Sequence, residues 1–273
     1  MWYLYAKGSW IETTPPTRGE LFGDGVFETI RIWRGRALFL DEHLRRLREA
    51  AQVLSLRIPL AITDLKASIE YHANAHNSAR VKVVLLRAGE GAYAPPTTET
   101  LLRVYVTPLS EGNFPLGSPQ RVTIFPTAFT TPTPWSAYKT LSAIGYVQAA
   151  AYAQSQGCAD AIILSASGHI SETSRANLFF WDGENLHTPA LRSGCIRGIF
   201  RGRVLQIARQ LNISVKEGLY PPEMLMTAQE AFTTNVIQGI VPILGIREMG
   251  KTFRTGSTSQ AELIARALSK EDL

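Results

Sequence analysis

A polar segment from Pro108 to Pro119, rich in Gly, Pro and Ser, divides the chain of 273 residues into two parts. On both sides of it, short β-rich runs alternate with stretches in which apolar residues recur at helical spacing. A mixture of strands and helices in each part predicts α/β or α+β layers packed around a core. We therefore expect an N-terminal domain over residues 1–107, a linker over 108–119 and a C-terminal domain over 120–273.

The first part contains patterns for three strands and two helices. Asp41 is a candidate N-cap for a helix whose apolar stripe is Leu44, Leu47, Ala51 and Leu54. A second helix is expected to open at Thr63 or Asp64 and to end near His76. The expected strands cover residues 26–33, 81–86 and 101–106, with a turn at 34–35 and a glycine-rich loop at 88–92.

The second part continues the alternation. Ser259 followed by Glu262 is a capping-box pattern, which predicts a final helix over 260–268. A helix over 198–211 is expected to bury Val204, Leu205, Ala208 and Leu211. The remaining expected elements are strands at 122–125, 161–164, 178–181 and 231–234 and a helix at 140–156.

Charge and cysteine content exclude several classes of protein. Lys plus Arg number 28 against 23 for Asp plus Glu, a formal net charge of +5, which favours solubility or attraction of small anions. No basic run or aromatic–basic ladder is present, so a nucleic-acid partner is not expected. Cys158 and Cys195 lie far apart without metal or redox spacing, which indicates a reducing compartment and no metal site. Without a signal peptide or an 18-residue apolar run, we expect a cytoplasmic protein with no membrane contact.

Lys139 is a candidate nucleophile. Most lysines near the start of a helix are solvated surface residues, but the residues that follow Lys139 are small and apolar. This composition indicates a buried helix with the lysine at its entrance. Desolvation there would lower the pKa of the lysine and make it a better amine nucleophile.

Glu172 is a candidate buried acid. It lies shortly before Asn177, where a strongly apolar strand is expected to begin, although a plain turn acid would look the same. A carboxylate in the interior needs a cationic partner, and a protonated pyridine nitrogen is one candidate.

Two further segments are candidates for binding a phosphate. His43 and Arg46 are three residues apart and share a helix face, so an arginine there could reach a phosphate. The alternative interpretation is an exposed basic helix surface. The segment from Gly194 to Phe200 opens a helix, whose free N–H groups and positive dipole end favour an anion. Residues 233–235 end a strand and offer more donors.

Six motifs, taken together and in order, resemble the class IV aminotransferase superfamily, the fold-type IV enzymes that use pyridoxal 5′-phosphate (PLP). The resemblance covers residues 19–245. Its motifs are FGDGVFET at 22–29, DEHLRRL at 41–47, YKTL at 138–141, ETSRANLF at 172–179, GCIRGI at 194–199, and TN at 234–235 with VP at 241–242.

This resemblance implies a small N-terminal α/β domain, a larger C-terminal pseudobarrel and a homodimer. Lys139 would be the catalytic residue that carries PLP as a Schiff base and moves the α-proton, and Glu172 would pair with the pyridine nitrogen. Arg46 and the N–H groups of Ile199 and Phe200 would bind the phosphate. The other residues implied at the cofactor are Asn177, Ile196, Gly198, Thr234 and Asn235.

The resemblance further implies a small, anionic, amino-acid-like substrate. Residues 87–93, 139–141, 217–221 and 234–242 are similar to segments of aminodeoxychorismate lyase, which makes 4-aminobenzoate and pyruvate in folate biosynthesis. The alternatives are a transaminase of branched-chain or D-amino acids and a binding protein that has the same fold but no catalytic activity. Candidate substrate residues are Phe27, Arg31, Arg87 and Tyr93.

The chain departs from the usual family pattern at four positions. Phe200 and Val236 stand where phosphate-binding hydroxyl residues are common, and Ser142 and Ala143 replace an Asn-Tyr pair. An aromatic hydroxyl is therefore missing unless another residue supplies it. These changes leave the substrate more open than the cofactor.

Overall fold

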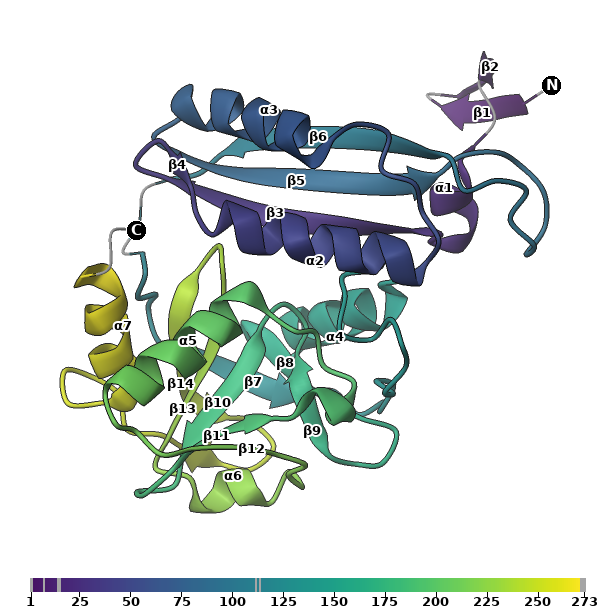
Figure 1. Ribbon diagram of the computed structural model, residues 1–273. Coiled ribbons are helices and arrows are strands. Elements are labelled where there is room, and N and C mark those ends of the chain that lie inside the picture. The colour runs from purple at the N-terminus through teal and green to yellow at the C-terminus, as the bar shows by residue number, and fades with distance from the viewer. Residues whose placement is uncertain (1, 7, 14–15, 111, 113, 271–273) are drawn as a thin grey trace.

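The computed structural model describes residues 2–6, 8–13, 16–110, 112 and 114–270, and the other positions of the predicted domains and linker lie outside it. Strands and helices alternate in both halves of the chain, which confirms the expected α/β mixture. Figure 1 shows two layers, an upper sheet with its helices and a lower curled sheet surrounded by helices.

The upper layer is an antiparallel sheet of four strands among the described residues, in the order β4-β3-β5-β6. Alternation places Val26, Ile30 and Ile32 on one face of β3, where they pack against helices α2 and α3. The bounds are β3 Gly25–Trp33, β4 Arg36–Ala37, β5 Ser78–Arg87, β6 Thr100–Pro108, α2 Leu40–Val53 and α3 Ile62–Asn74.

The starts of these helices differ from the sequence prediction. Phe39 is the N-cap of α2, and Asp41 lies inside the first turn, where its carboxylate accepts a hydrogen bond from Lys66 Nζ at 2.7 Å. Likewise, α3 begins at Ile62, so Thr63 and Asp64 are already helical. The start of α2 coincides with a packing contact, since the Phe39 ring lies 6.0 Å from the Phe200 ring.

Short elements precede the upper sheet. Strands β1 (Trp2–Ala6) and β2 (Ser9–Thr13) form an antiparallel hairpin that stands apart from both layers in Figure 1. Helix α1 (Arg18–Phe22) has a complete capping box at Thr17 and ends at Gly23 with φ 66°. Sequence analysis did not predict these elements.

The lower layer is a curled sheet of nine strands within the described ranges. Its order is β12-β11-β10-β13-β14-β7-β8-β9, with β15 paired to β14. The bounds are β7 Gln120–Ile124, β8 Asp160–Leu164, β9 Ile170–Thr173, β10 Asn177–Trp181, β11 Leu186–Pro189, β12 Val215–Gly218, β13 Glu230–Asn235, β14 Gly239–Ile246 and β15 Lys251–Thr252.

Two predictions about the helices of the lower layer are wrong. Helix α4 begins at Ile144 instead of Thr140, and Leu211 caps the end of α5 with 36% of its surface exposed instead of facing inward. Ser259 Oγ accepts from the N–H of Glu262 at 3.2 Å, as the capping pattern predicted. The bounds are α4 Ile144–Ser155, α5 Ile199–Gln210, α6 Met224–Thr227, α7 Gln260–Lys270 and the 3₁₀ turn Leu191–Ser193.

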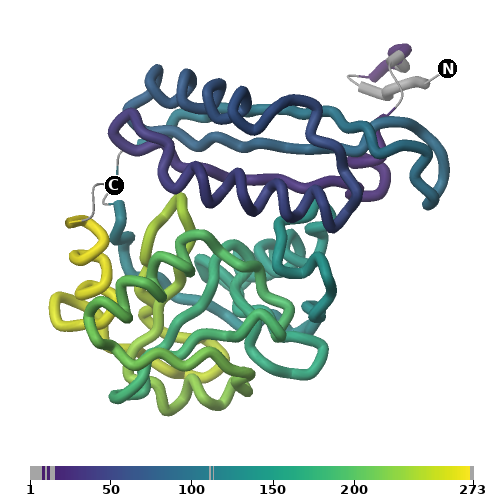
Figure 2. The backbone as a smooth tube through the Cα atoms, in the orientation of Figure 1, coloured from purple at the N-terminus to yellow at the C-terminus, as the bar shows by residue number. Residues whose placement is uncertain are grey.

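The chain passes from β6 to β7 along the edge of the molecule where α7 lies (Figures 1 and 2). Phe114 and Leu116 on this path pack against the buried cluster of α5, α7 and β13. The boundaries at 107 and 120 stay predictions, and Pro108 itself is the last residue of β6.

The core of the upper layer offers a direct test of the packing. Ile69 of α3 is fully buried, whereas Tyr71 on the same helix is 75% exposed. Replacing Ile69 by Ala leaves a cavity, so we expect I69A to lose about 2–5 kcal/mol of unfolding free energy, measured by urea denaturation. Y71A should stay within about 0.5 kcal/mol of the parent. Equal losses for the two variants would contradict this packing.

Candidate active site

A cavity of about 890 Å³ lies where the two layers meet. Its walls come from β3, α2, residues 129–146, β9 and the start of α5, and from residues 234–238. Both candidate reactive groups, Lys139 and Glu172, line it, and so do His43 and Arg46. The structure therefore brings together residues that are far apart in sequence.

Lys139 is held by backbone pairing with β3. The N–H of Phe27 donates to the carbonyl of Lys139 at 2.8 Å, and the N–H of Leu141 donates to the carbonyl of Gly25 at 3.0 Å. A Cβ at Gly25 would come within 2.4 Å of a backbone oxygen of β5, so glycine is needed for this close approach. The expected buried helix from residue 140 is wrong, because α4 starts at Ile144, which is 70% exposed.

The surroundings of Lys139 lower the pKa of its amine. Its ammonium nitrogen lies 4.7 Å from the centre of the Phe27 ring. Desolvation, and then the positive charge of Arg46, lower the pKa of Lys139 to about 8, against the opposing pull of Glu28 and Glu172. Lys139 therefore has the lowered pKa that was predicted, but it lies in a segment paired with β3 and not at the entrance of a buried helix.

Glu172 is a buried acid on β9, with 3% of its surface exposed. Its Oε1 accepts from the hydroxyl of Tyr146 at 2.7 Å and from the N–H of Ile196 at 3.1 Å, and its Oε2 accepts from Asn177 Nδ2 at 3.2 Å. Burial raises the pKa of Glu172 to about 7, although the hydrogen bonds from Tyr146 and from the N–H of Ile196 and the charge of Lys139 lower it.

The backbone around Glu172 is fixed by Asp160 at the start of β8. Its carboxylate accepts from Thr173 Oγ1 at 2.8 Å and from the N–H of Ser174 at 3.0 Å. The turn after Glu172 is therefore tied to the neighbouring strand, which fixes the backbone that carries the acid.

Arg46 belongs to a buried charge cluster with Glu28 and His43. Arg46 donates to both oxygens of Glu28 at 2.7 Å and to the carbonyl of Arg197 at 2.7 Å. Burial opposes ionisation of Glu28, but Arg46 and His43 outweigh it and lower the pKa of Glu28 to about 2. Glu28 therefore stays ionised and holds the guanidinium beside the cavity.

The start of α5 forms another wall. Gly198 is its N-cap without a side-chain hydrogen bond, and a Cβ there would come within 2.0 Å of Asn177 Oδ1. Gly198, Ile199 and Phe200 line the cavity, so the helix presents its first N–H groups there. The Phe200 side chain itself is buried in the core.

Thr234 and Asn235 complete this end of the cavity. Within the described structure, the buried hydroxyl of Thr234 has no hydrogen-bond partner. Asn235 Oδ1 instead accepts from the N–H groups of Ile237 and Gln238 at 2.9 and 2.8 Å and shapes the loop between β13 and β14.

Of the four predicted substrate residues, only Phe27 lines the cavity. Arg31 is buried beneath it and donates to the carbonyl of Ile237 at 2.6 Å, and Arg87 binds Asp24 and three carbonyl groups. Tyr93 is 88% exposed on the loop after β5. The structure thus gives Arg31 and Arg87 structural partners and does not bring these three residues to the cavity.

Two residues at the site escaped the sequence analysis. Glu28 shares the inward face of β3 with apolar Val26 and Ile30, so a buried carboxylate needing a cationic partner could have been inferred from alternation. Tyr146 gave no such signal, because its orientation depends on where α4 begins. Tyr146 supplies an aromatic hydroxyl at the site, and its partner is Glu172.

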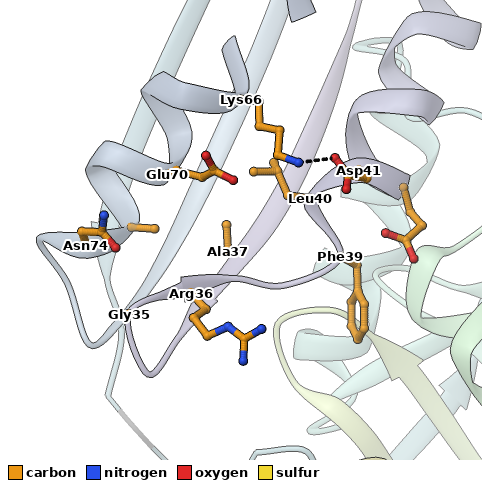
Figure 3. A pocket seen from close by; sticks show the side chains of 11 residues that line it. Gly35, Arg36, Ala37, Phe39, Leu40, Asp41, Lys66, Glu70 and Asn74 are labelled. Atoms are coloured by element: carbon orange, nitrogen blue, oxygen red, sulfur yellow. Dashed lines mark hydrogen bonds and ion pairs between the residues drawn. The ribbon is translucent and has the colours of Figure 1, made fainter. Parts of the chain in front are cut away.

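A second pocket, of about 490 Å³, lies between the starts of α2 and β4 and the end of α3. Figure 3 shows that its polar groups include Arg36, Glu70 and the ion pair of Lys66 with Asp41. The Asp41 side chain is 78% exposed, so this pocket lacks the buried acid and amine of the larger cavity.

Metal-binding clusters and membrane-spanning helices are both absent from the described residues. They contain no group of three or more His, Cys, Asp or Glu side chains placed to hold a metal ion. None of their helices combines the length and hydrophobicity needed to cross a membrane.

Comparison with known proteins places the chain among enzymes of two activities. Aminodeoxychorismate lyase of Bacillus subtilis (strain 168) is 24% identical over 271 residues, covering 94% of this chain and 91% of the relative. A putative branched-chain-amino-acid aminotransferase of Methanocaldococcus jannaschii is 28% identical over 255 residues, covering 89% and 87%.

The fold also matches a solved structure. A Brucella abortus aminotransferase bound to PLP superimposes with a TM-score of 0.81 at 21% identity, covering 98% of this chain and 96% of that one. This likeness confirms the fold-type IV architecture. Residues 25–246 match the family model for amino-transferase class IV. The chain therefore belongs to the class IV aminotransferase family, whose enzymes depend on PLP.

Proposed function

We propose that this enzyme is an aminodeoxychorismate lyase, which converts 4-amino-4-deoxychorismate to 4-aminobenzoate and pyruvate, with Lys139 as its catalytic residue. The observation that carries the proposal is the convergence of the Lys139 amine and the Glu172 carboxylate on one cavity that also holds several cations. A desolvated amine and a buried acid in one cleft are typical of a catalytic site.

The residues present fit PLP. Arg46, the N–H groups of Ile199 and Phe200 and the unpartnered hydroxyl of Thr234 would hold the phosphate. Glu172 would face the ring nitrogen, positioned by Asn177 and by the N–H of Ile196. Backbone donors, Arg46 and Thr234 thus take the place of the side-chain hydroxyls that Phe200 and Val236 cannot supply.

When bound, PLP supplies a carbonyl that condenses with amines and a ring that withdraws electrons from the carbon bearing the substrate amine. Lys139 would contribute the amine nucleophile, and its amine would take the proton from the carbon that bears the substrate amine. Because its pKa lies near 8, Lys139 can both give and accept a proton near neutral pH. When ionised, Glu172 would place a negative charge beside the ring nitrogen, and Tyr146 orients that carboxylate.

The charge of the cavity favours the lyase substrate. Arg80 of β5 and Arg175, which follows β9, line the cavity in addition to Arg46 and are both exposed toward solvent. 4-Amino-4-deoxychorismate carries two carboxylates, which a cavity lined by guanidinium groups complements. Of the two exposed arginines, Arg175 also donates to the carbonyl of Ala159 at 2.9 Å and lies 3.7 Å from Asp160. The similarity to the lyase of Bacillus subtilis over 94% of the chain agrees with this choice.

A transaminase of branched-chain or D-amino acids is the second candidate. Phe27, Phe129, Tyr138 and Ile144 give the cavity apolar walls that suit an aliphatic side chain. The relative from Methanocaldococcus jannaschii is named as a branched-chain enzyme. Both reactions begin with removal of the same proton by Lys139, so the contacts of the cofactor do not separate them.

A homodimer, a place in folate biosynthesis and a cytoplasmic location complete the proposal. Leu101 and Tyr105 on the outer strand β6 are 44% and 49% exposed and offer an apolar surface to a second copy. Cys158 and Cys195 are both free thiols, as a reducing compartment requires.

Trapping the cofactor tests the role of Lys139. Purified protein should be yellow, and borohydride reduction followed by peptide mass mapping should place the pyridoxyl group on Lys139. K139A should lose the label and at least about 100-fold in activity. K82M is the matched control, since Lys82 lies 4.5 Å from the same Phe27 ring, and it should keep the label. Label on Lys82, or colourless protein that binds no PLP, would refute the assignment.

Product analysis separates the two activities. Aminodeoxychorismate made in situ from chorismate and glutamine should yield equal amounts of 4-aminobenzoate and pyruvate, measured by chromatography. Branched-chain and D-amino acids with 2-oxoglutarate should give turnover at least tenfold lower. Turnover of these amino acids without any release of 4-aminobenzoate would replace the lyase by the transaminase.

Replacing Arg80 tests whether this residue binds a carboxylate of the substrate. In R80M we expect KM for aminodeoxychorismate to rise roughly tenfold or more, as for loss of a hydrogen bond to a charged group, with little change in kcat. R103M on the neighbouring strand β6 is the control, because Arg103 pairs with Glu20 at 3.8 Å and does not line the cavity. An unchanged KM in R80M would remove Arg80 from the substrate site.

A further inference from the structure

His43 is a buried group that the proposed mechanism leaves unused. It is 1% exposed, lies one turn before Arg46 on α2, and lines the same cavity. Its Nδ1 lies 2.7 Å from Glu28 Oε2, while its Nε2 is buried without a hydrogen-bond partner in the described structure. An orphaned ring nitrogen beside a cavity needs either a ligand or a reason to stay unpaired.

Glu28 determines which ring nitrogen carries the proton. Its pKa of about 2 keeps Glu28 ionised at neutral pH, so the carboxylate can only accept. The Nδ1 of His43 must therefore be the donor, and Nε2 holds a lone pair whenever the ring is neutral. Burial lowers the pKa of His43, which favours that neutral form in the free protein.

The orphaned nitrogen belongs to the anion-binding end of the cavity. Arg46 donates to the carbonyl of Arg197, directly before the N-terminus of α5. Phe39 at the start of α2 contacts Phe200 in the first turn of α5. Figure 1 likewise shows α2 on the side of the upper layer that faces α5. Helix α2, which carries His43 and Arg46, therefore contacts the start of α5, and Thr234 lines the same cavity.

We propose that His43 is a positioning residue that takes up one proton from solvent at Nε2 when the cofactor's phosphate binds, and then donates to a phosphate oxygen. A lone pair facing a phosphate dianion would be repulsive, whereas a protonated ring between Glu28 and the phosphate is paired on both sides. This inference rests on the proposed phosphate end of the cavity and adds a pH dependence to it.

The charges around the ring support this change of state. Arg46 opposes a proton on His43, and Glu28 and Glu42 favour it. The phosphate would add negative charge on the side where Nε2 is unpaired. The charged groups near this region are Glu28 on β3 and Glu42 and Arg46 on α2. Lys139 lines the same cavity, and Arg203 on α5 lies 5.0 Å from the Phe39 ring.

Pyridoxine 5′-phosphate is the appropriate probe, because it carries an alcohol in place of the aldehyde and forms no Schiff base with Lys139. Near pH 7.5 its phosphate is largely a dianion. Calorimetric titration of the wild-type protein in buffers of different ionisation enthalpy should show uptake of close to one proton, beyond that seen with unphosphorylated pyridoxine. Because binding takes up a proton, affinity should fall as pH rises, approaching tenfold per pH unit. The ³¹P shift of the bound probe should remain that of a dianion.

Two variants separate His43 from a general effect on folding. In H43Q the amide NH₂ can occupy the place of Nε2 and donate without titrating, so binding should persist with no proton uptake. In H43N the side chain can still donate to Glu28 but does not reach the cavity. Its affinity for the phosphorylated probe should fall by about 10- to 100-fold, with that for pyridoxine unchanged.

The outcomes distinguish the inference from the proposed function. Wild-type protein that binds the probe without proton uptake, or H43Q that takes up the same proton, would overturn the role of His43 and leave the cofactor site standing. A wild-type protein that binds neither the probe nor PLP would refute the proposed function itself.

Discussion

The site depends on the backbone pairing of residues 139–141 with the first residues of β3. Two hydrogen bonds, from Phe27 N–H to Lys139 and from Leu141 N–H to Gly25, join a segment of the lower layer to the edge of the upper sheet. The lysine is therefore placed by main-chain contacts and not by packing of its own long side chain. Gly25 suits this junction, because a Cβ there would come within 2.4 Å of a backbone oxygen of β5 and 2.7 Å of the Leu141 side chain.

Buried charges then set the protonation states around this junction. Glu28 and Glu172 are similarly buried, yet the pKa of Glu28 falls to about 2 and that of Glu172 rises to about 7. The difference follows from their partners, since Glu28 has a bidentate guanidinium and Glu172 only neutral donors. The same residue type thus acts as a permanent anion in one wall and as an acid that can titrate in another.

The sequence predicted three of the four described strands of the upper sheet, with β4 missed, because alternation and residue type carry that information. The family motifs predicted that Lys139, Glu172 and Arg46 meet at one site. Helix starts were predicted less well. Asp41 and Thr63 resemble caps, but α2 and α3 begin earlier, where Phe39 and Ala61 stand without side-chain caps. Arg31 and Arg87 were misplaced for a related reason, since a sequence does not show whether an arginine meets a ligand or backbone carbonyls.

The hydrogen bond from Arg31 to the carbonyl of Ile237 has a consequence for how ligands enter the cavity. It fastens the loop between β13 and β14 to β3, and the Arg31 guanidinium is also sandwiched near the rings of Trp33 and Phe114. That side of the cavity is a fixed wall. Trp135 and Ile144, by contrast, line the cavity while 48% and 70% exposed, so they mark its open mouth. Molecules that enter on this side pass these two side chains, so the size and apolar surface of Trp135 and Ile144 bear on which ligands can enter there.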